Sequence, residues 1–196
     1  MSSAEFNVDK LDQSLHKIGI LDQKYRKLLP GTSAKDVQKV WSKIEDQDEQ
    51  NINKVRSYLD NFSVDQLSKL KPESINTIFL VVQHAPATER EKYLSILKEF
   101  NKRGLLGIRK IAMMEDRILC CDQQKPQLYG TQFCGDDGNF KIWEFEGSLE
   151  DLLSRRRKVG IKTDFKEELK SWGITTEELE DGEKIQKIIP TTQINN

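Results

Sequence analysis

The segment from Pro72 to His84 constrains the fold more than any other part of the chain. It carries apolar side chains on nearly every side of a helix: Ile75, Ile78, Phe79, Leu80, Val81 and Val82. A helix that is apolar all round lies at the centre of a domain, where other elements cover it. Its β-branched residues also fit a buried strand. However, Pro72 at the first position and the polar Glu73 and Ser74 favour a helix that ends before Pro86.

Amphipathic segments on both sides of this helix supply elements that can cover it. We expect helices over residues 8–29, from 34 to about 59, from 64 to before Pro72, from 88 to about 103, and over 108–119. Apolar residues recur at helical spacing in the first two: Leu11, Leu15, Ile18, Tyr25 and Leu29 in one, and Val37, Trp41, Ile44, Ile52, Val55 and Leu59 in the other. The predicted N-caps are Asn7, Ser33, Ser63 and Thr88, and the predicted stops are Pro30-Gly31 and Gly104.

The pattern changes after residue 126. Residues 127–134 and 140–145 flank Gly135-Asp136-Asp137-Gly138, a strong turn signal, and predict a β-hairpin. Further helices are expected from Ser148 to Gly160, over 164–172 and over 176–180. The predicted fold is mainly α: a multi-helix, bundle-like domain of residues 1–147 that ends in the hairpin, and a short helical C-terminal extension, residues 148–196, packed on it and frayed from Pro190 onward.

The composition excludes several classes of protein. Hydrophobic residues make up 36% and charged residues 32%, with 31 basic against 32 acidic side chains. This is typical of a globular domain and gives no basic surface for nucleic acid. The longest apolar run, Ile78 to Val82, is too short to span a bilayer, and the N-terminus has no secretory signal. The three cysteines cannot all pair, which indicates free thiols and a cytoplasmic location.

Two acids interrupt the apolar stripes of the first two helices. Asp22 occupies the stripe position between Ile18 and Tyr25, and Asp48 the position between Ile44 and Ile52. A buried carboxylate needs a partner. Arg26 follows Asp22 by four residues and Asn51 follows Asp48 by three, so each can lie beside its acid on the same face. Either the acids lie at the wet edge of a wide stripe, or these four residues line a polar pocket.

Other polar residues are candidates for the same pocket. Gln83 and His84 end the central helix, where a histidine serves either as a C-cap or as a general acid and base. Asp116 and Arg117 are either a surface ion pair or a fork for an anionic group. On a strand, Tyr129 and Thr131 would share one face, with Gly130 and Gln132 on the other. We expect Asp22, Arg26, Asp48, His84, Asp116 and Arg117 to converge.

Several other signals point to no site. The chain has no Cys-x-x-Cys, no His-Glu-x-x-His, no Gly-x-Ser-x-Gly and no glycine-rich phosphate loop, so no cofactor is predicted. His84, an aspartate and a cysteine could together hold a metal ion, but nothing in the sequence specifies such a site, and no metal is predicted. The basic run from Arg155 to Lys158 precedes Gly160 and is interpreted as a solvated helix end. Cys134 lies next to the Thr131-Gln132 segment, but nothing in the sequence indicates a nucleophilic thiol there.

The polar residues resemble, in their order, a bacterial domain family of unknown function. The resemblance covers residues 11–133 and returns near 155–160, with a departure between Arg56 and Leu70, where a Gly-Trp-Pro-like turn is common in the family. It implies that the polar positions belong together and implies no activity. The pieces that carry it are Asp22-Gln23-x-x-Arg26, Asp48-x-x-Asn51, Gln83-His84-Ala85, Asp116-Arg117 and Gln127-x-Tyr129-Gly130-Thr131-Gln132.

Two functions follow from these residues. In the first, a pocket binds a small polar or anionic ligand and hydrolyses or transfers part of it. Arg26 and Arg117 hold the anion, His84 moves protons with Asp48 or Asp116 as its orienting acid, and Tyr129 and Gln132 donate hydrogen bonds. In the second, the chain is a non-enzymatic immunity or adaptor-type protein. The polar set is then a structural network, and a protein partner binds elsewhere, around exposed Trp143 and Trp172.

Overall fold

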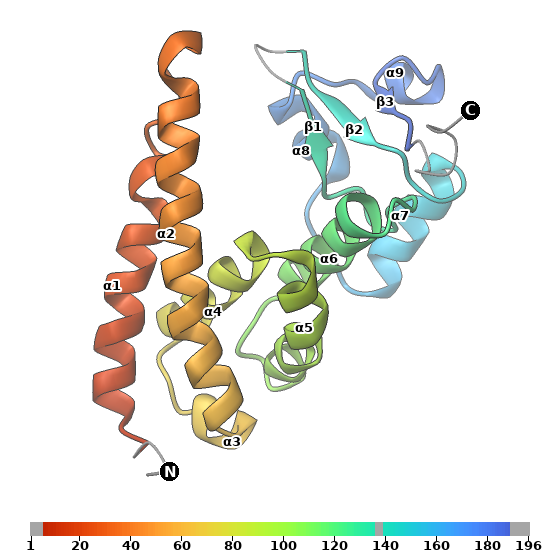
Figure 1. The fold of residues 1–196 in the computed structure, drawn as a ribbon. Coiled ribbons are helices and arrows are strands. Elements are labelled where there is room, and N and C mark those ends of the chain that lie inside the picture. Colours follow the sequence, from red (N-terminus) through yellow and green to blue (C-terminus); the bar gives the residue numbers. More distant parts are fainter. Residues whose placement is uncertain (1–5, 136–138, 189–196) are drawn as a thin grey trace, which may run out of the picture. The chain divides into compact units, whose positions relative to one another are not determined.

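A computed structural model describes residues 6–135 and 139–188 and confirms a mainly α-helical protein with a small sheet that follows the main run of helices (Figure 1). The chain divides into two compact units, Met1–Leu106 and Gly107–Asn196, called here the N-terminal and C-terminal units. The predicted boundary after residue 147 falls inside the C-terminal unit. The hairpin therefore groups with the helices that follow it.

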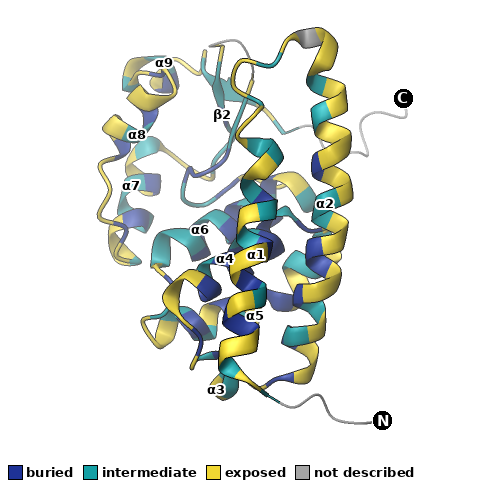
Figure 2. Cartoon of the chain, turned by 90° about the vertical axis from the view of Figure 1, so that its left-hand side faces the viewer, coloured by how far each residue is buried: buried dark blue, intermediate teal, exposed yellow. Residues whose placement is uncertain are grey.

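The N-terminal unit is built around the predicted central helix. Its elements are α1 (Val8–Arg26), α2 (Ala34–Asn61), α3 (Val64–Leu67), α4 (Pro72–His84) and α5 (Ala87–Lys102). Helix α4 packs against α1, α2 and α5, and eight of its residues are buried. Figure 2 shows buried residues gathered where these helices face one another. The strand interpretation of this segment is therefore wrong, as Pro72 at the helix start indicated.

The stripes of α1 and α2 are buried as predicted over most of their length. Leu11, Leu15 and Ile18 are buried on α1, as are Ile44, Ile52, Val55 and Leu59 on α2. Trp41 is 43% exposed and Val37 only partly buried, contrary to the prediction. Helix α2 has 28 residues and α1 has 19, so the first turns of α2 extend past the helix that covers the rest.

The helix ends follow local chemistry, with two exceptions. Asn7 accepts a hydrogen bond from the Lys10 amide at 3.0 Å, and Ser63 and Ser148 form capping boxes, all as predicted. Helix α5 begins after Pro86 rather than at Thr88. Ser33 is an N-cap whose hydroxyl donates to the Asp36 carboxylate instead of accepting from the backbone.

The C-terminal unit combines short helices with a three-stranded sheet. Helix α6 (Ile108–Arg117) continues into a π-helical turn, η1 (Ile118–Asp122), and the later helices are α7 (Leu149–Lys158), α8 (Phe165–Ser171) and α9 (Thr176–Glu180). The sheet order is β1 (Phe133–Cys134), β2 (Lys141–Trp143) and β3 (Ile185–Gln186), with β1 antiparallel and β3 parallel to β2. Its core consists of Ile142, Leu152, Phe165, Leu169, Ile174 and Leu179.

The predicted hairpin is present but much shorter than expected. Phe133 pairs with Ile142, and Gln127 forms an isolated bridge with Phe145, whereas residues 128–132 form a loop held mainly by side chains rather than a strand. The alternation predicted for Tyr129 and Thr131 is therefore wrong. The third strand, β3, was not predicted. The centre of the turn, residues 136–138, and the tail from residue 190 lie outside the described residues.

Three smaller expectations concern membranes, cysteines and tryptophans. Within the described residues, no helix combines the length and the apolar character needed to cross a bilayer. Cys120, Cys121 and Cys134 are free. Trp172 is 38% exposed and stacks on Phe133, with ring centroids 5.0 Å apart, whereas Trp143 is half-buried, contrary to the prediction that it is exposed.

Candidate functional site

Four of the predicted site residues meet between three helices of the N-terminal unit, and we call them the charged cluster: Asp22 and Arg26 from α1, Asp48 from α2 and His84 from α4. Asp22 Oδ1 lies 3.1 Å from His84 Nδ1 and 3.5 Å from an Arg26 Nη1. Arg26 also binds Asp48 through both terminal nitrogens, at 2.9 Å and 2.6 Å. The gaps in the two stripes therefore did mark a shared polar site.

The charged cluster is mostly withdrawn from solvent. The Asp22 side chain is 1% exposed, and those of Arg26, Asp48 and His84 are 16–18% exposed. Burial by itself raises the pKa of Asp22, but the hydrogen bond and charge of His84, followed by Arg26 and Gln23, outweigh burial and lower that pKa below its ordinary value. Asp22 is therefore an ionised carboxylate held in place by three partners.

The partners within the cluster differ from those expected. His84 contacts Asp22, whereas the sequence interpretation gave Asp48 or Asp116 as its orienting acid. Asp48 is instead the bidentate partner of Arg26. The reason is geometric. A carboxylate and a guanidinium can form two parallel hydrogen bonds, so the Asp48 carboxylate faces Arg26 at the end of α1 rather than His84 at the end of α4.

Gln83 and Asn51 lie beside the cluster and take no part in the hydrogen bonds and ion pairs that join its four members. Gln83 is buried next to His84, and its backbone oxygen accepts a 3.5 Å contact from Arg90. Asn51 is 1% exposed and lies one turn beyond Asp48 on the same face of α2. Its Oδ1 accepts from Gln47 at 3.0 Å, and its Nδ2 has no acceptor among the described residues.

A groove adjoins the cluster along α1 and α4. Its volume is about 760 Å³, and its lining includes Asp12, His16, Gly19, Thr77 and Gln23. Gln23 donates to Asp22 Oδ2 at 2.7 Å, which connects the groove to the cluster. The helices approach closely at the groove floor, where a Cβ on Gly19 would lie 2.7 Å from Thr77 Oγ1.

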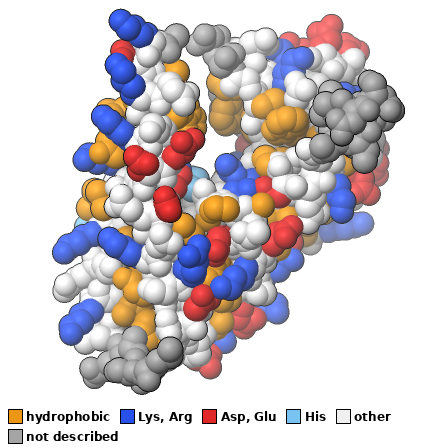
Figure 3. Space-filling view, in the orientation of Figure 1, with side chains coloured by type: hydrophobic (Ala, Val, Ile, Leu, Met, Phe, Trp, Pro, Cys, Tyr) orange, Lys and Arg blue, Asp and Glu red, His pale blue; other side chains and the backbone are white. Residues whose placement is uncertain are grey.

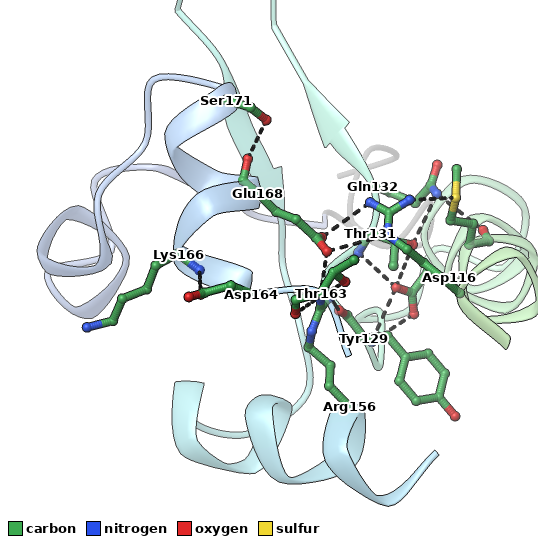
Figure 4. A network of polar contacts seen from close by, with 12 residues as sticks. Asp116, Tyr129, Thr131, Gln132, Arg156, Thr163, Asp164, Lys166, Glu168 and Ser171 are labelled. Carbon is green, nitrogen blue, oxygen red and sulfur yellow. Dashed lines mark hydrogen bonds and ion pairs between the residues drawn. The ribbon is translucent and has the colours of Figure 1, made fainter. Parts of the chain in front are cut away.

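The C-terminal unit holds the other half of the predicted set, arranged around Asp116 (Figure 4). This carboxylate is fully buried at the end of α6. It accepts hydrogen bonds of 2.8–3.2 Å from the amides of Leu128, Tyr129 and Thr131, and one of 2.9 Å from the Thr131 hydroxyl. Asp116 therefore replaces the strand ladder that residues 127–132 lack.

Two glutamines complete the fastening of this loop. The Gln127 side chain donates to the backbone oxygens of Gln132 and Trp143 and accepts from the Gln132 amide. Gln132 in turn donates to the Met113 oxygen at 3.2 Å. The carboxamide predicted to stabilise developing charge is thus engaged with the backbone.

The basic run from Arg155 to Lys158 was predicted to be a solvated helix end. This is confirmed for Arg157 and Lys158, which are exposed, but it is wrong for Arg156. Arg156 is 2% exposed and donates to the Tyr129 oxygen at 2.8 Å and to Glu168 at 2.8 Å (Figure 4). Its guanidinium also lies over the Phe165 ring at 4.7 Å. Arg155 donates to the Leu128 oxygen at 2.9 Å. The sequence signal missed here was an arginine one helical turn after Leu152, on the buried side of α7.

Tyr129 and Arg117 are the remaining predicted residues. The Tyr129 ring is half-buried, and burial, together with Glu115 and Asp116, raises the pKa of its phenol. Arg117 is the partly buried last residue of α6. Asp116, Arg117, Tyr129, Thr131 and Gln132 thus belong to the C-terminal unit, and their convergence with the charged cluster stays a prediction.

Among the described residues, three offer the donor atoms for a metal ion. One ligand atom each from Asp22, Asp48 and His84 lies within 4.8 Å of the other two. The fold and site thus define a mainly α-helical protein of two units, one with a charged cluster beside a groove and the other with a bonded polar network. Comparisons with protein-family models, with curated proteins and with solved structures found no match to this chain. The family resemblance therefore stays a proposal.

Proposed function

We propose that the N-terminal unit binds a small polar or anionic ligand at the charged cluster, and that the ligand is hydrolysed or transferred there. The observation that supports this is the contact between a 1% exposed carboxylate, Asp22, and a histidine, His84, that keeps 16% of its side chain in contact with solvent. A carboxylate that orients an imidazole recurs in sites of acyl transfer and hydrolysis.

The energetics of the cluster support the same proposal. Burying charged groups costs free energy that their mutual attraction only partly returns, and apolar packing of similar volume is often as stable. Three helices that already bury Leu15, Ile18, Ile44 and Val82 do not need two acids, an arginine and a histidine to hold them together. Polar groups kept at this cost are typical of functional sites.

The groove gives such a ligand room. Gln23 lines the groove and binds Asp22, so a ligand there lies one side chain away from the cluster. The proposal leaves out Asp116 as a catalytic acid and Thr131 and Gln132 as ligand-binding residues, because their polar atoms are engaged in holding the loop.

A ligand screen by two-dimensional NMR tests the proposal. Inorganic phosphate, sulfate, citrate and simple sugars are added to the ¹⁵N-labelled protein in buffer with excess EDTA, and the amide shifts of α1, α2 and α4 are followed. We expect a saturable shift that is lost in His84→Gln and kept in Lys54→Gln, which changes an exposed side chain of α2 outside the groove. A shift that survives His84→Gln unchanged would contradict the proposal.

A non-enzymatic interaction protein is the second candidate. The observation that favours it is that the four side chains of the cluster bind one another, as they would in a purely structural network. Thermal melts separate the two candidates. A structural role predicts that His84→Gln costs about 0.5–3 kcal/mol, whereas a functional site predicts little loss or a gain in stability.

A further inference from the structure

We infer that the charged cluster is a binding site for a divalent first-row transition-metal ion, with Asp22, Asp48 and His84 as its ligands. The inference rests on the proposed ligand-binding site and deepens it. Both terminal nitrogens of Arg26 bind Asp48, so a metal ion would supply the positive charge that attracts an anionic ligand.

The donor atoms are already close to the required positions. One atom each from Asp22, Asp48 and His84 lies within 4.8 Å of the other two. Small side-chain rotations are enough to place all three atoms at the metal–ligand distance of roughly 2.0–2.2 Å that nitrogen and oxygen ligands keep from zinc. The three residues come from three different helices that pack on one another, so the backbone holds the set in place.

The chemistry of the donors selects the class of ion. Imidazole suits zinc, iron, cobalt and nickel, while carboxylates are accepted by all of these and by manganese. Magnesium and calcium prefer all-oxygen sites. Three protein ligands leave at least one position open, as in catalytic rather than structural zinc sites, and that position is available to water or to an anionic ligand.

In this structure the Arg26 guanidinium lies at the place where the metal ion would bind. One of its terminal nitrogens lies 2.9 Å from Asp48 Oδ1 and 3.5 Å from Asp22 Oδ1, between the two carboxylates. The two acids carry two negative charges and Arg26 one positive charge, so a divalent ion balances both acids where Arg26 balances one. The Arg26 side chain is 18% exposed and long enough to turn outward when an ion enters.

Two observations outside the ligand set point the same way. Asn51, 99% buried on the same face of α2 as Asp48, has a donor, Nδ2, without an acceptor among the described residues. A buried donor of this kind indicates a missing acceptor such as a metal-bound water or anion. Exposed Glu45, Asp46 and Glu49 also surround Asp48, and Figure 3 shows acidic side chains gathered over the middle of α2. Their field attracts cations.

A bound ion of this class would explain how an anionic ligand is accommodated and activated. It attracts the anion directly, polarises its oxygen and lowers the pKa of a bound water toward neutrality. Asp22, Asp48 and His84 would hold the ion, and the Asn51 amide would donate to the water or the anion.

The test is a titration of the metal-stripped full-length protein with Co²⁺ alone, followed by its visible absorption, with Zn²⁺ as competitor. We expect one ion per chain. His84→Asn and Asp22→Asn should lower the affinity by ~10–100-fold or more, and His16→Asn, the matched histidine control, should leave it unchanged. Arg26→Gln should raise it, because the competing cation is gone. Equal losses in His84→Asn and His16→Asn would overturn the inference.

A measurement on the unmodified chain guards against variants that fail to fold. The protein has two histidines, so paramagnetic Co²⁺ should shift or broaden the imidazole signals of His84 far more strongly than those of His16. An unaffected His84 would refute the metal site. The ligand screen in EDTA is an independent test. If a ligand binds there and Co²⁺ does not bind, the metal site is rejected and the proposed ligand-binding site stands. If Co²⁺ binds but no ligand binds, with EDTA or with Co²⁺ present, the proposed ligand-binding function is rejected.

Discussion

Replacing Asp116 with asparagine should destabilise the C-terminal unit far more than a change of one atom suggests. The carboxylate accepts from three backbone amides and one hydroxyl, and burial raises its pKa against the opposing effect of these bonds. In Asp116→Asn one oxygen can still serve Leu128 and Tyr129, but the new NH₂ group faces the Thr131 amide, another donor.

The magnitude follows from these contacts. Hydrogen bonds to a charged acceptor contribute about 1.5–3 kcal/mol and neutral ones about 0.5–1.5, and a stranded buried donor costs about 1–3. Two weakened bonds and a stranded Thr131 amide therefore cost about 3–6 kcal/mol. A neutral amide is easier to bury than a carboxylate, so we expect a net loss near the lower end of this range, about 3 kcal/mol.

Urea unfolding followed by tryptophan fluorescence measures this loss. Trp143 and Trp172 report on the C-terminal unit and Trp41 on the N-terminal unit, so Trp41→Phe isolates the first signal. Glu183→Gln, an exposed acid in the same unit, is the control and should change stability by less than about 0.5 kcal/mol. A loss below about 1 kcal/mol for Asp116→Asn would refute the structural role assigned to this carboxylate and return it to the list of catalytic candidates.

Four further outcomes are expected. Gly130→Ala should lower the stability measured by calorimetry more than Gly160→Ala does. Both glycines have positive φ (67° and 81°), but of the two only Gly130 would bring a Cβ against side chains, at 3.0–3.1 Å. Equal losses of stability would mean that backbone strain alone acts. Arg156→Met should cost ~1.5–3 kcal/mol, because it removes the 2.8 Å charged hydrogen bond to the partly buried Glu168 and leaves that carboxylate to Arg109, whereas Arg157→Met, exposed on the same turn, should be near neutral in the same urea assay. A hydrogen bond from Thr163 and then the neighbouring Arg109 and Arg156 lower the pKa of Glu168 against the effect of burial, so the stability that Glu168 contributes is present above the ordinary value of 4.5 and is lost as the pH falls through and below it. Glu168→Gln should flatten the stability curve over that range, and an unchanged slope would contradict this. Thiol titration of the denatured protein should give three cysteines with or without reductant, and a lower count without reductant would show a disulfide.

The sequence by itself determined the helices and half of the site. Helical hydrogen bonds join residues four apart, so the periodicity of α1 and α2, the capping boxes at Ser63 and Ser148 and the apolar character of α4 are written locally. The same periodicity marked Asp22 and Asp48 as acids on buried faces. His84 ends the central helix, against which α1 and α2 pack. Asp22, Asp48 and His84 therefore come close together once the buried faces of the three helices meet.

Tertiary structure decided what depends on residues far apart in the chain. Strand β3 lies more than forty residues from its partner β2, and no local pattern announces that pairing. The residues from 127 to 132 have the composition of a strand, but the Asp116 carboxylate, rather than a neighbouring strand, accepts the hydrogen bonds of their backbone amides. Arg156 is buried only because Glu168 and the Tyr129 carbonyl come from other segments to meet it. A buried polar group is stable only with its partners, and which partners arrive is a property of the packed chain rather than of the segment that carries the group.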